Sequence, residues 1–202
     1  GNWGKGELIT ITPKREALVK ISVIHKEIKQ TNPIGLAIGG LRPQSMDDLL
    51  PYLVELNVNE IHIFMQKQVA RYRLSERAQN RWNTIILNSL KQSKSNYKPD
   101  LHVWSDFSQM TSYLVKHYDH HFTLSPHAKD TLYDIVEKEG KNCVVIGGEK
   151  GLTKEEENIL RNATFKPARM SNSILRSITT AIISASLLNS ARLSTKSNQK
   201  FT

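Results

Sequence analysis

Residues Asn142 to Leu188 hold the most informative part of the chain, which begins Asn142-Cys-Val-Val-Ile146-Gly-Gly-Glu149-Lys-Gly151. Cys143 to Ile146 form a continuous apolar run, which predicts a strand covered on both faces of a parallel sheet. The glycines that follow favour a sharp turn whose backbone can approach a ligand closely. Thr153 and Glu156 have the spacing of a capping box, so a helix is predicted to begin after Thr153.

A second turn follows at the end of a short predicted strand and reads Met170-Ser-Asn-Ser-Ile174-Leu175-Arg176. It leads into an apolar helix predicted to continue to Leu188. Two such turns could together hold a small molecule or an anion. The chain carries neither G-x-G-x-x-G nor G-x-x-x-x-G-K-[ST], so the patterns of dinucleotide-binding and P-loop proteins are missing.

The composition is that of an ordinary globular chain with an excess of positive charge. The 202 residues are 23% charged and 39% hydrophobic, with a formal net charge of +9. This charge favours polyanionic partners, nucleic acid first and an acidic membrane second. The longest apolar stretch, Ile174 to Leu188, contains Arg176 and is too short and too polar to cross a bilayer. We therefore expect no membrane association and a cytoplasmic location.

The first thirty residues differ in pattern from the rest. Gly1 to Gly6 are predicted to form a loop or hairpin tip, whereas Glu7–Thr12 and Ala17–His25 alternate like two β-strands. Two strands alone do not form a stable sheet, so they are expected to be the end of a small β-barrel. Ser190 to Thr202 are polar and are predicted to be a frayed tail.

From Ile34 onwards, predicted strands alternate with predicted helices, which indicates an α/β fold with a mostly parallel sheet. Before Asn142 the expected strands are Ile34–Ile38, Ile61–Met65, Leu101–Trp104 and His121–Leu124. One helix is expected to begin at Ser45, with Asp48 completing a capping box. Three more are expected at Ser75–Ser93, Phe107–Tyr118 and His127–Glu139. Cys143 and Trp82 are predicted to be buried packing residues.

The two turns resemble the cofactor loops of the SPOUT methyltransferases, in particular the RsmE family, whose patterns are G-P-E-G-G and L-G-x-x-I-L-R-T-E-T-A. The residues that match are Gly147, Glu149, Gly151, Ile174, Leu175, Arg176 and Thr179. The residues that depart are Gly148, Lys150, Met170, Ser171 and Ile178. Glu55-Leu-Asn-Val58 and Arg81-Trp-Asn-Thr-Ile85 are similar to further blocks of the family, in the same order.

This resemblance implies the fold and its division into domains. Residues 31–190 would form a SPOUT methyltransferase domain, an α/β trefoil knot whose mostly parallel sheet is flanked by helices. Residues 1–30 would be a remnant of a PUA-like β-barrel, and residues 191–202 a flexible tail. The family consists of homodimers, so the apolar helix from Ser173 to Leu188 is a candidate dimer face.

The resemblance also implies the activity, which is methylation of N3 of a uridine in 16S ribosomal RNA with S-adenosylmethionine as cofactor and the small ribosomal subunit as partner. Arg176 would be the catalytic residue. The cofactor-binding residues would be Leu124, Ser125, Ile146, Gly147, Gly148, Glu149, Gly151, Met170, Ile174 and Leu175. Phosphate contacts with the RNA are expected from Lys67, Arg71, Arg73 and Arg81.

Simpler interpretations stand beside these. Arg176 could cap a helix or form an ion pair, and Glu149 could be an exposed turn carboxylate. His117, His120 and His121 suggest a metal site, but a solvated helix end explains them better, so no metal is expected. The departures from the family pattern leave two other functions open: a catalytically degenerate RNA-binding module, and a SPOUT methyltransferase with another RNA target.

Overall fold

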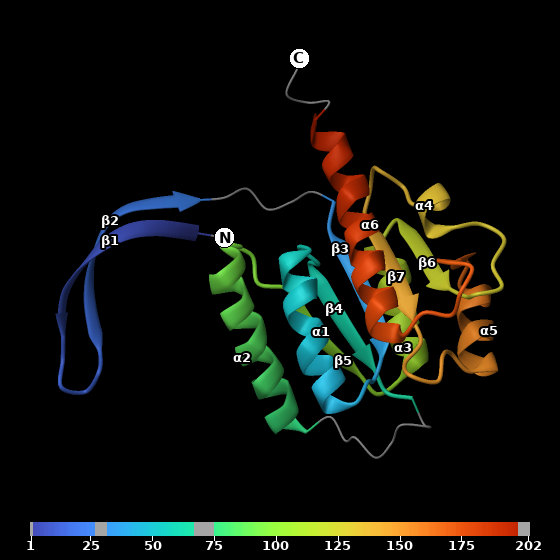
Figure 1. The fold of residues 1–202 in the computed structure, drawn as a ribbon, viewed down its shortest axis with the longest axis horizontal. Helices are drawn as coiled ribbons and strands as arrows, with labels where there is room; N and C mark the ends of the chain where they lie inside the picture. Colours follow the sequence, from blue (N-terminus) through green and yellow to red (C-terminus); the bar gives the residue numbers. More distant parts are fainter. Residues whose placement is uncertain (1, 27–31, 67–74, 198–202) are drawn as a thin grey trace. The chain divides into compact units, whose positions relative to one another are not determined.

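The computed structural model describes residues 2–26, 32–66 and 75–197, with side chains up to residue 194 (Figure 1). The chain divides into two units, Gly1–Gln30 and Thr31–Thr202. The first unit is an antiparallel hairpin of β1 (Asn2–Ile11) and β2 (Ala17–Lys26). The prediction that residues 1–6 form a loop is wrong for residues 2–6, because they pair with β2 and Trp3 stacks on His25. The barrel itself stays a prediction.

The second unit is built on a six-stranded parallel sheet with the order β5-β4-β3-β7-β6-β8. The strands are β3 (Ile34–Gly39), β4 (Glu60–Phe64), β5 (Asp100–Trp104), β6 (His120–Leu124), β7 (Asn142–Ile146) and β8 (Lys166–Ala168). The helices are α1 (Pro43–Glu55), α2 (Glu76–Ser93), α3 (Phe107–His117), α4 (Leu132–Ile135), α5 (Lys154–Asn162) and α6 (Ser177–Ser197). The predicted α/β fold class is confirmed. The trefoil knot implied by the resemblance stays a prediction.

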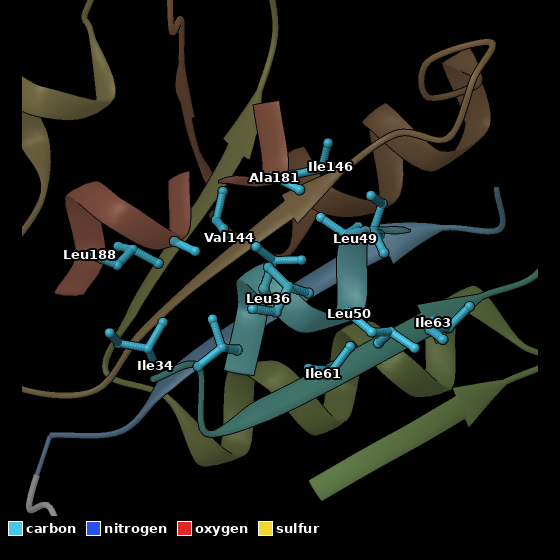
Figure 2. Packing of buried hydrophobic residues seen from close by; sticks show 14 of the residues in the cluster. Ile34, Leu36, Leu49, Leu50, Ile61, Ile63, Val144, Ile146, Ala181 and Leu188 are labelled. Atoms are coloured by element: carbon cyan, nitrogen blue, oxygen red, sulfur yellow. The ribbon is translucent and has the colours of Figure 1, made fainter. Parts of the chain in front are cut away.

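Alternating side chains of the central strands enter two separate cores, one on each face of the sheet. Leu36 of β3 and Val144 of β7 pack with α1, α2 and α6. Figure 2 shows these two residues with Leu49 of α1 and with Ala181 and Leu188 of α6. Ala37 and Val145, one residue further along each strand, pack instead with α3 and α5. Both central strands are therefore covered on both faces, which explains their continuous apolar sequence. The predicted burial of Cys143 and Trp82 is confirmed.

The helix starts at Ser75 and Thr153 were predicted correctly, whereas the start at Ser45 was not. The hydroxyls of Ser75 and Thr153 accept from backbone N–H groups of the first turn of α2 and α5, and Glu156 completes the capping box at Thr153. The predicted start at Ser45 is wrong, because Arg42 is the N-cap of α1 and Pro43 is its first residue. Proline has a fixed φ and needs no N–H at that position, so it sets the helix start without a side-chain cap.

The predicted helix from His127 to Glu139 is also wrong. The structure has only the four-residue α4, which begins after Thr131 and ends where Val136 adopts an extended conformation. The Thr131 hydroxyl accepts from the Asp134 N–H, so a local cap begins the helix at Leu132, five residues later than predicted. Gly140, with a φ of 82°, then reverses the chain before β7.

Residues 191–197 are not a frayed tail, because α6 continues to Ser197. Arg192 is only 4% exposed, and its guanidinium donates to Asn59 Oδ1 at 2.9 Å, Asn189 Oδ1 at 2.6 Å and the Asn57 carbonyl at 3.3 Å. Asn59 Oδ1 also accepts from the Ile34 N–H at the start of β3. A buried polar side chain therefore extends the helix where the apolar pattern ends. Burial lowers the pKa of Arg192 to about 10.

Arg192→Ala is expected to lower the free energy of unfolding by about 2–3 kcal/mol, because it removes a buried side chain and three part-buried hydrogen bonds, two of which join α6 to the loop before β4. The change can be measured by urea unfolding followed by circular dichroism. Arg161→Ala on the exposed surface of α5 is the control and should change stability by less than about 0.5 kcal/mol. Equal, small effects of both substitutions would mean that the end of α6 contributes nothing to the fold.

Candidate functional site

The two turns singled out in the sequence line one cavity of about 870 Å³. It lies at the carboxyl ends of β6, β7 and β8 and extends to the start of α6. Figure 1 shows the ends of β6 and β7 near the start of α6. This is the edge of a parallel sheet where ligands usually bind. All eleven residues predicted for cofactor binding and catalysis line it: Leu124, Ser125, Ile146, Gly147, Gly148, Glu149, Gly151, Met170, Ile174, Leu175 and Arg176.

The two turns are joined by a hydrogen bond at Gly148. The Gly148 carbonyl accepts from Ser177 Oγ at 2.8 Å and from the Gly151 N–H at 3.0 Å. In this loop Gly151 has a positive φ, of 75°, whereas Lys150 does not. Lysine in place of the family's glycine at position 150 is therefore compatible with the backbone.

A residue that the sequence did not suggest, Gln66, lies two residues after the end of β4 and holds the same loop. It is 3% exposed. Its Oε1 accepts from the Gly148 N–H at 3.2 Å, and its Nε2 donates to the Gly151 carbonyl at 2.9 Å and to Glu156 Oε2 at 2.8 Å. No local pattern could reveal these contacts, because Gln66 and Gly148 are 82 residues apart in the chain.

Glu149 at the exposed tip of the loop has an ion-pair partner. Its Oε1 lies 2.8 Å from Arg42 Nε, at the N-cap of α1. This bond connects the loop after β7 with the loop after β3, so Glu149 is more than an exposed turn carboxylate without a partner. Both side chains remain well exposed, so the pair adds at most about 1 kcal/mol to stability.

Arg176 lies directly before α6 and is exposed at the wall of the cavity. Among the described residues no carboxylate forms an ion pair with its guanidinium. Ile178, where the family pattern has glutamate, packs against the core of α1 and α6. An uncompensated guanidinium at a cavity wall can bind a phosphate or polarise a carbonyl oxygen. Proton acceptors in the same lining are His127, Glu149 and Glu157.

The residues predicted to contact RNA are only partly covered. Lys67, Arg71 and Arg73 lie outside the described residues. Arg81 projects from α2, and its Nη2 lies 2.6 Å from Asp47 Oδ2 of α1. Its side chain is 65% exposed, so the pair leaves much of the guanidinium open to solvent.

A second polar cluster lies on β4 and β5, beside Tyr113 of α3. Glu60, His62 and His102 are the one group in the described part of the chain whose ligand atoms lie close enough for a metal ion, within 4.8 Å; His117, His120 and His121 form no such group there. The indole N–H of Trp104 donates to His62 Nδ1 at 3.2 Å. An indole can only donate, so Nδ1 has the lone pair and His62 Nε2 carries the proton that faces Glu60 Oε2 at 3.3 Å.

The two histidine rings of this cluster are stacked, with centroids 4.8 Å apart and planes 11° apart. A metal ion lies in the plane of each ring that binds it, so two stacked rings cannot share one ion in this arrangement. The cluster is better described as a hydrogen-bonded network in which His62 is buried and neutral and Glu60 is ionised. Burial lowers the pKa of His62. Burial of Glu60 opposes its ionisation, but hydrogen bonds from His62, Tyr118 and Tyr113 lower its pKa to about 2.

His62→Gln is expected to make stability less dependent on pH below about pH 6.5. Because burial lowers the pKa of His62 in the fold, the unfolded chain binds more protons as pH falls, and stability is lost there. Glutamine keeps a donor and an acceptor but does not titrate. Urea unfolding between about pH 7.5 and pH 5.5 tests this. If the free energy of unfolding depended on pH in the same way in both proteins, the neutral state assigned to His62 would be contradicted. The titratable groups that face His62 are Glu60, His102 and His117.

Comparison with known proteins shows the family of this chain. Residues 28–189 match the RNA methyltransferase domain family, so the chain belongs to that family. It is similar to ribosomal RNA small subunit methyltransferase E 1 of Borreliella burgdorferi, with 21% identity over 170 residues that cover 83% of this chain and 71% of the relative. The resemblance to RsmE proteins predicted from the two loops is thereby confirmed.

Solved structures show the same fold. Ribosomal RNA small subunit methyltransferase E of Neisseria gonorrhoeae, bound to S-adenosylmethionine, aligns with a TM-score of 0.81 and 21% identity over 94% of this chain and 79% of that one. The methyltransferase Lpg2936 of Legionella pneumophila, in complex with the same cofactor, aligns with a TM-score of 0.82, 20% identity and the same coverage. No helix among the described residues is long and apolar enough to cross a membrane.

Ser177→Ala is expected to lower the free energy of unfolding by about 1 kcal/mol, because it removes the hydrogen bond that joins α6 to the Gly148 carbonyl. Thermal or urea unfolding measures the change. Ser186→Ala at an exposed position of α6 is the matched control and should be neutral or slightly stabilising. If the two substitutions had the same effect, the Ser177 bond would not couple the two loops.

Proposed function

We propose that this protein transfers a methyl group from S-adenosylmethionine to N3 of a uridine in 16S ribosomal RNA. The observation that carries the proposal is the convergence of the Gly147–Gly151 loop and the Met170–Leu175 turn on one cavity, with Arg176 at its wall. Membership of the RNA methyltransferase family and the similarity to methyltransferase E proteins support the reaction and the substrate.

The cavity suits this cofactor in size and lining. About 870 Å³ falls within the usual range of small-molecule sites. The glycine loop offers backbone groups without side chains in the way, and Leu124, Met170 and Leu175 supply apolar walls. The cofactor, when bound, supplies a methyl group activated by a sulfonium.

The residues around the cavity then have defined tasks. The new bond forms between uracil N3 and the methyl carbon while the carbon–sulfur bond breaks, and the N3 proton passes to a base. We assign Arg176 to stabilise the negative charge that develops on a uracil carbonyl oxygen, since a guanidinium remains charged at any working pH. His127, Glu149 and Glu157 are the groups in the lining that can accept the proton.

RNA binding, assembly and location complete the proposal. The net charge of +9 favours a polyanion, and Lys67, Arg71, Arg73 and Arg81 are the proposed phosphate contacts with 16S RNA or the small ribosomal subunit. We propose a homodimer that buries α6, on which Ile183 and Leu193 are 37% and 52% exposed, and a cytoplasmic location.

Calorimetry with S-adenosylmethionine tests the cofactor assignment, and mass spectrometry of 16S RNA from a deletion strain tests the substrate. We expect saturable binding and the loss of one 3-methyluridine. No binding at millimolar cofactor would refute the enzyme and favour the degenerate RNA-binding module, which the apolar Ile178 makes worth considering. Binding with unchanged 3-methyluridine would favour a methyltransferase with another RNA target.

Arg176→Ala is expected to reduce kcat by about 10²–10³-fold, as for other groups that stabilise transition-state charge, with little change in cofactor affinity. Single-turnover methylation of 16S RNA by purified protein measures this. Arg161→Ala, which changes the same residue type on exposed α5, should retain full activity. Normal methylation by Arg176→Ala would refute the role of this residue.

A further inference from the structure

We propose that Gln66 is a positioning residue that sets the shape of the Gly147–Gly151 loop, and that Gly148 stands in place of the family's proline because of this contact. The proposal rests on the proposed function in one respect: it takes this loop to be the cofactor loop. Gln66 does not line the cavity, so it acts through the loop and not by direct contact with a ligand.

The contacts of Gln66 determine which way its amide points. The carboxylate of Glu156 can only accept hydrogen bonds, and it lies 2.8 Å from Gln66 Nε2. Oε1 must therefore face the Gly148 N–H, as observed. Glu156 is itself fixed, because its Oε2 accepts from the Thr153 N–H at 2.7 Å in the capping box of α5. The orientation of Gln66 thus depends on a helix start and not on solvent.

One side chain consequently holds both ends of the loop. It accepts from the N–H of Gly148 and donates to the carbonyl of Gly151, while those two residues also bond to each other. Gln66 is 3% exposed, so water does not compete for these bonds. Buried hydrogen bonds of this kind are costly to break, because each lost partner leaves a polar group unsatisfied.

The same contact explains the departure at position 148. Proline has no N–H and could not donate to Gln66 Oε1. A Cβ atom at Gly148 would also lie 2.6 Å from Oε1, closer than atoms can approach without movement. A Cβ atom at Gly39 of β3 would meet the same oxygen at 2.6 Å. Gln66 therefore fills a space that is open only because residues 39 and 148 are glycines. Its hydrogen bonds constrain the loop in place of the proline that the family has at position 148.

Gln66→Glu keeps the size of the side chain but replaces the donor with a carboxylate next to Glu156. We expect the Kd for S-adenosylmethionine to rise about ten-fold or more, measured by calorimetry. Gln109→Glu on the exposed surface of α3 is the matched control and should bind like the wild type. The double variant Gln66→Glu with Glu156→Gln restores a donor opposite residue 66, so it should recover part of the affinity.

Hydrogen exchange of the Gly148 amide tests the contact without any ligand. Gln66→Glu should accelerate exchange at Gly148 relative to the wild type, and the double variant should slow it again. If the wild type fails to bind the cofactor but shows this pattern, the proposed function fails and the positioning role of Gln66 stands. If cofactor affinity and Gly148 exchange are both unchanged in Gln66→Glu, the positioning role is overturned.

A second comparison remains informative if Gln66→Glu does not fold. Gly148→Ala should weaken cofactor binding strongly in the wild-type background, because the new Cβ displaces Gln66. In a Gln66→Ala background the closest clash is removed and the new Cβ next meets the backbone of Gly40 and Gly39, at 3.2 and 3.3 Å, so the additional effect of Gly148→Ala should be several-fold smaller. Equal effects of Gly148→Ala in both backgrounds would overturn the pairing of these two positions.

Discussion

The backbone of Gly148 is the point on which the site depends. Its carbonyl accepts from Ser177 Oγ and from the Gly151 N–H, and its own N–H donates to Gln66. Three segments far apart in the chain, namely the residues just after β4, the loop after β7 and the start of α6, are thereby held at one residue. The cavity exists between the two turns because this junction fixes their separation.

The parallel sheet makes such a junction possible. β7 lies between β3 and β6, and β8 pairs with β6, so the carboxyl ends of these strands point the same way. Loops that leave the ends of β6 (Leu124), β7 (Ile146) and β8 (Ala168) therefore gather at one edge, although each strand ends about 22 residues after the one before it. Arg176 is placed there because it ends the turn before α6, whose own position is fixed by packing of residues such as Ala181 and Leu188 against the sheet.

What could be predicted from the sequence was local or already present in the family resemblance. The buried run at Cys143 and the caps at Ser75 and Thr153 depend on a few neighbouring residues, and all three were correct. Contacts across the sheet could not be predicted. Gln66 reaches Gly148 across 82 residues, and the network of His62 with Trp104 depends on the pairing of β4 with β5. Arg192 extends α6 through bonds to the loop before β4, so its polar sequence was misinterpreted as a tail.

The central claim is that the two turns form a slot for a sulfonium cofactor with Arg176 beside it. The most direct measurement is a crystal structure of the protein grown with S-adenosylhomocysteine. The account predicts electron density for the product between Gly147–Gly151 and Met170–Leu175, with its sulfur on the side of Arg176. Density bound elsewhere on the protein, or a cavity that stays without ligand at saturating concentration, would contradict it.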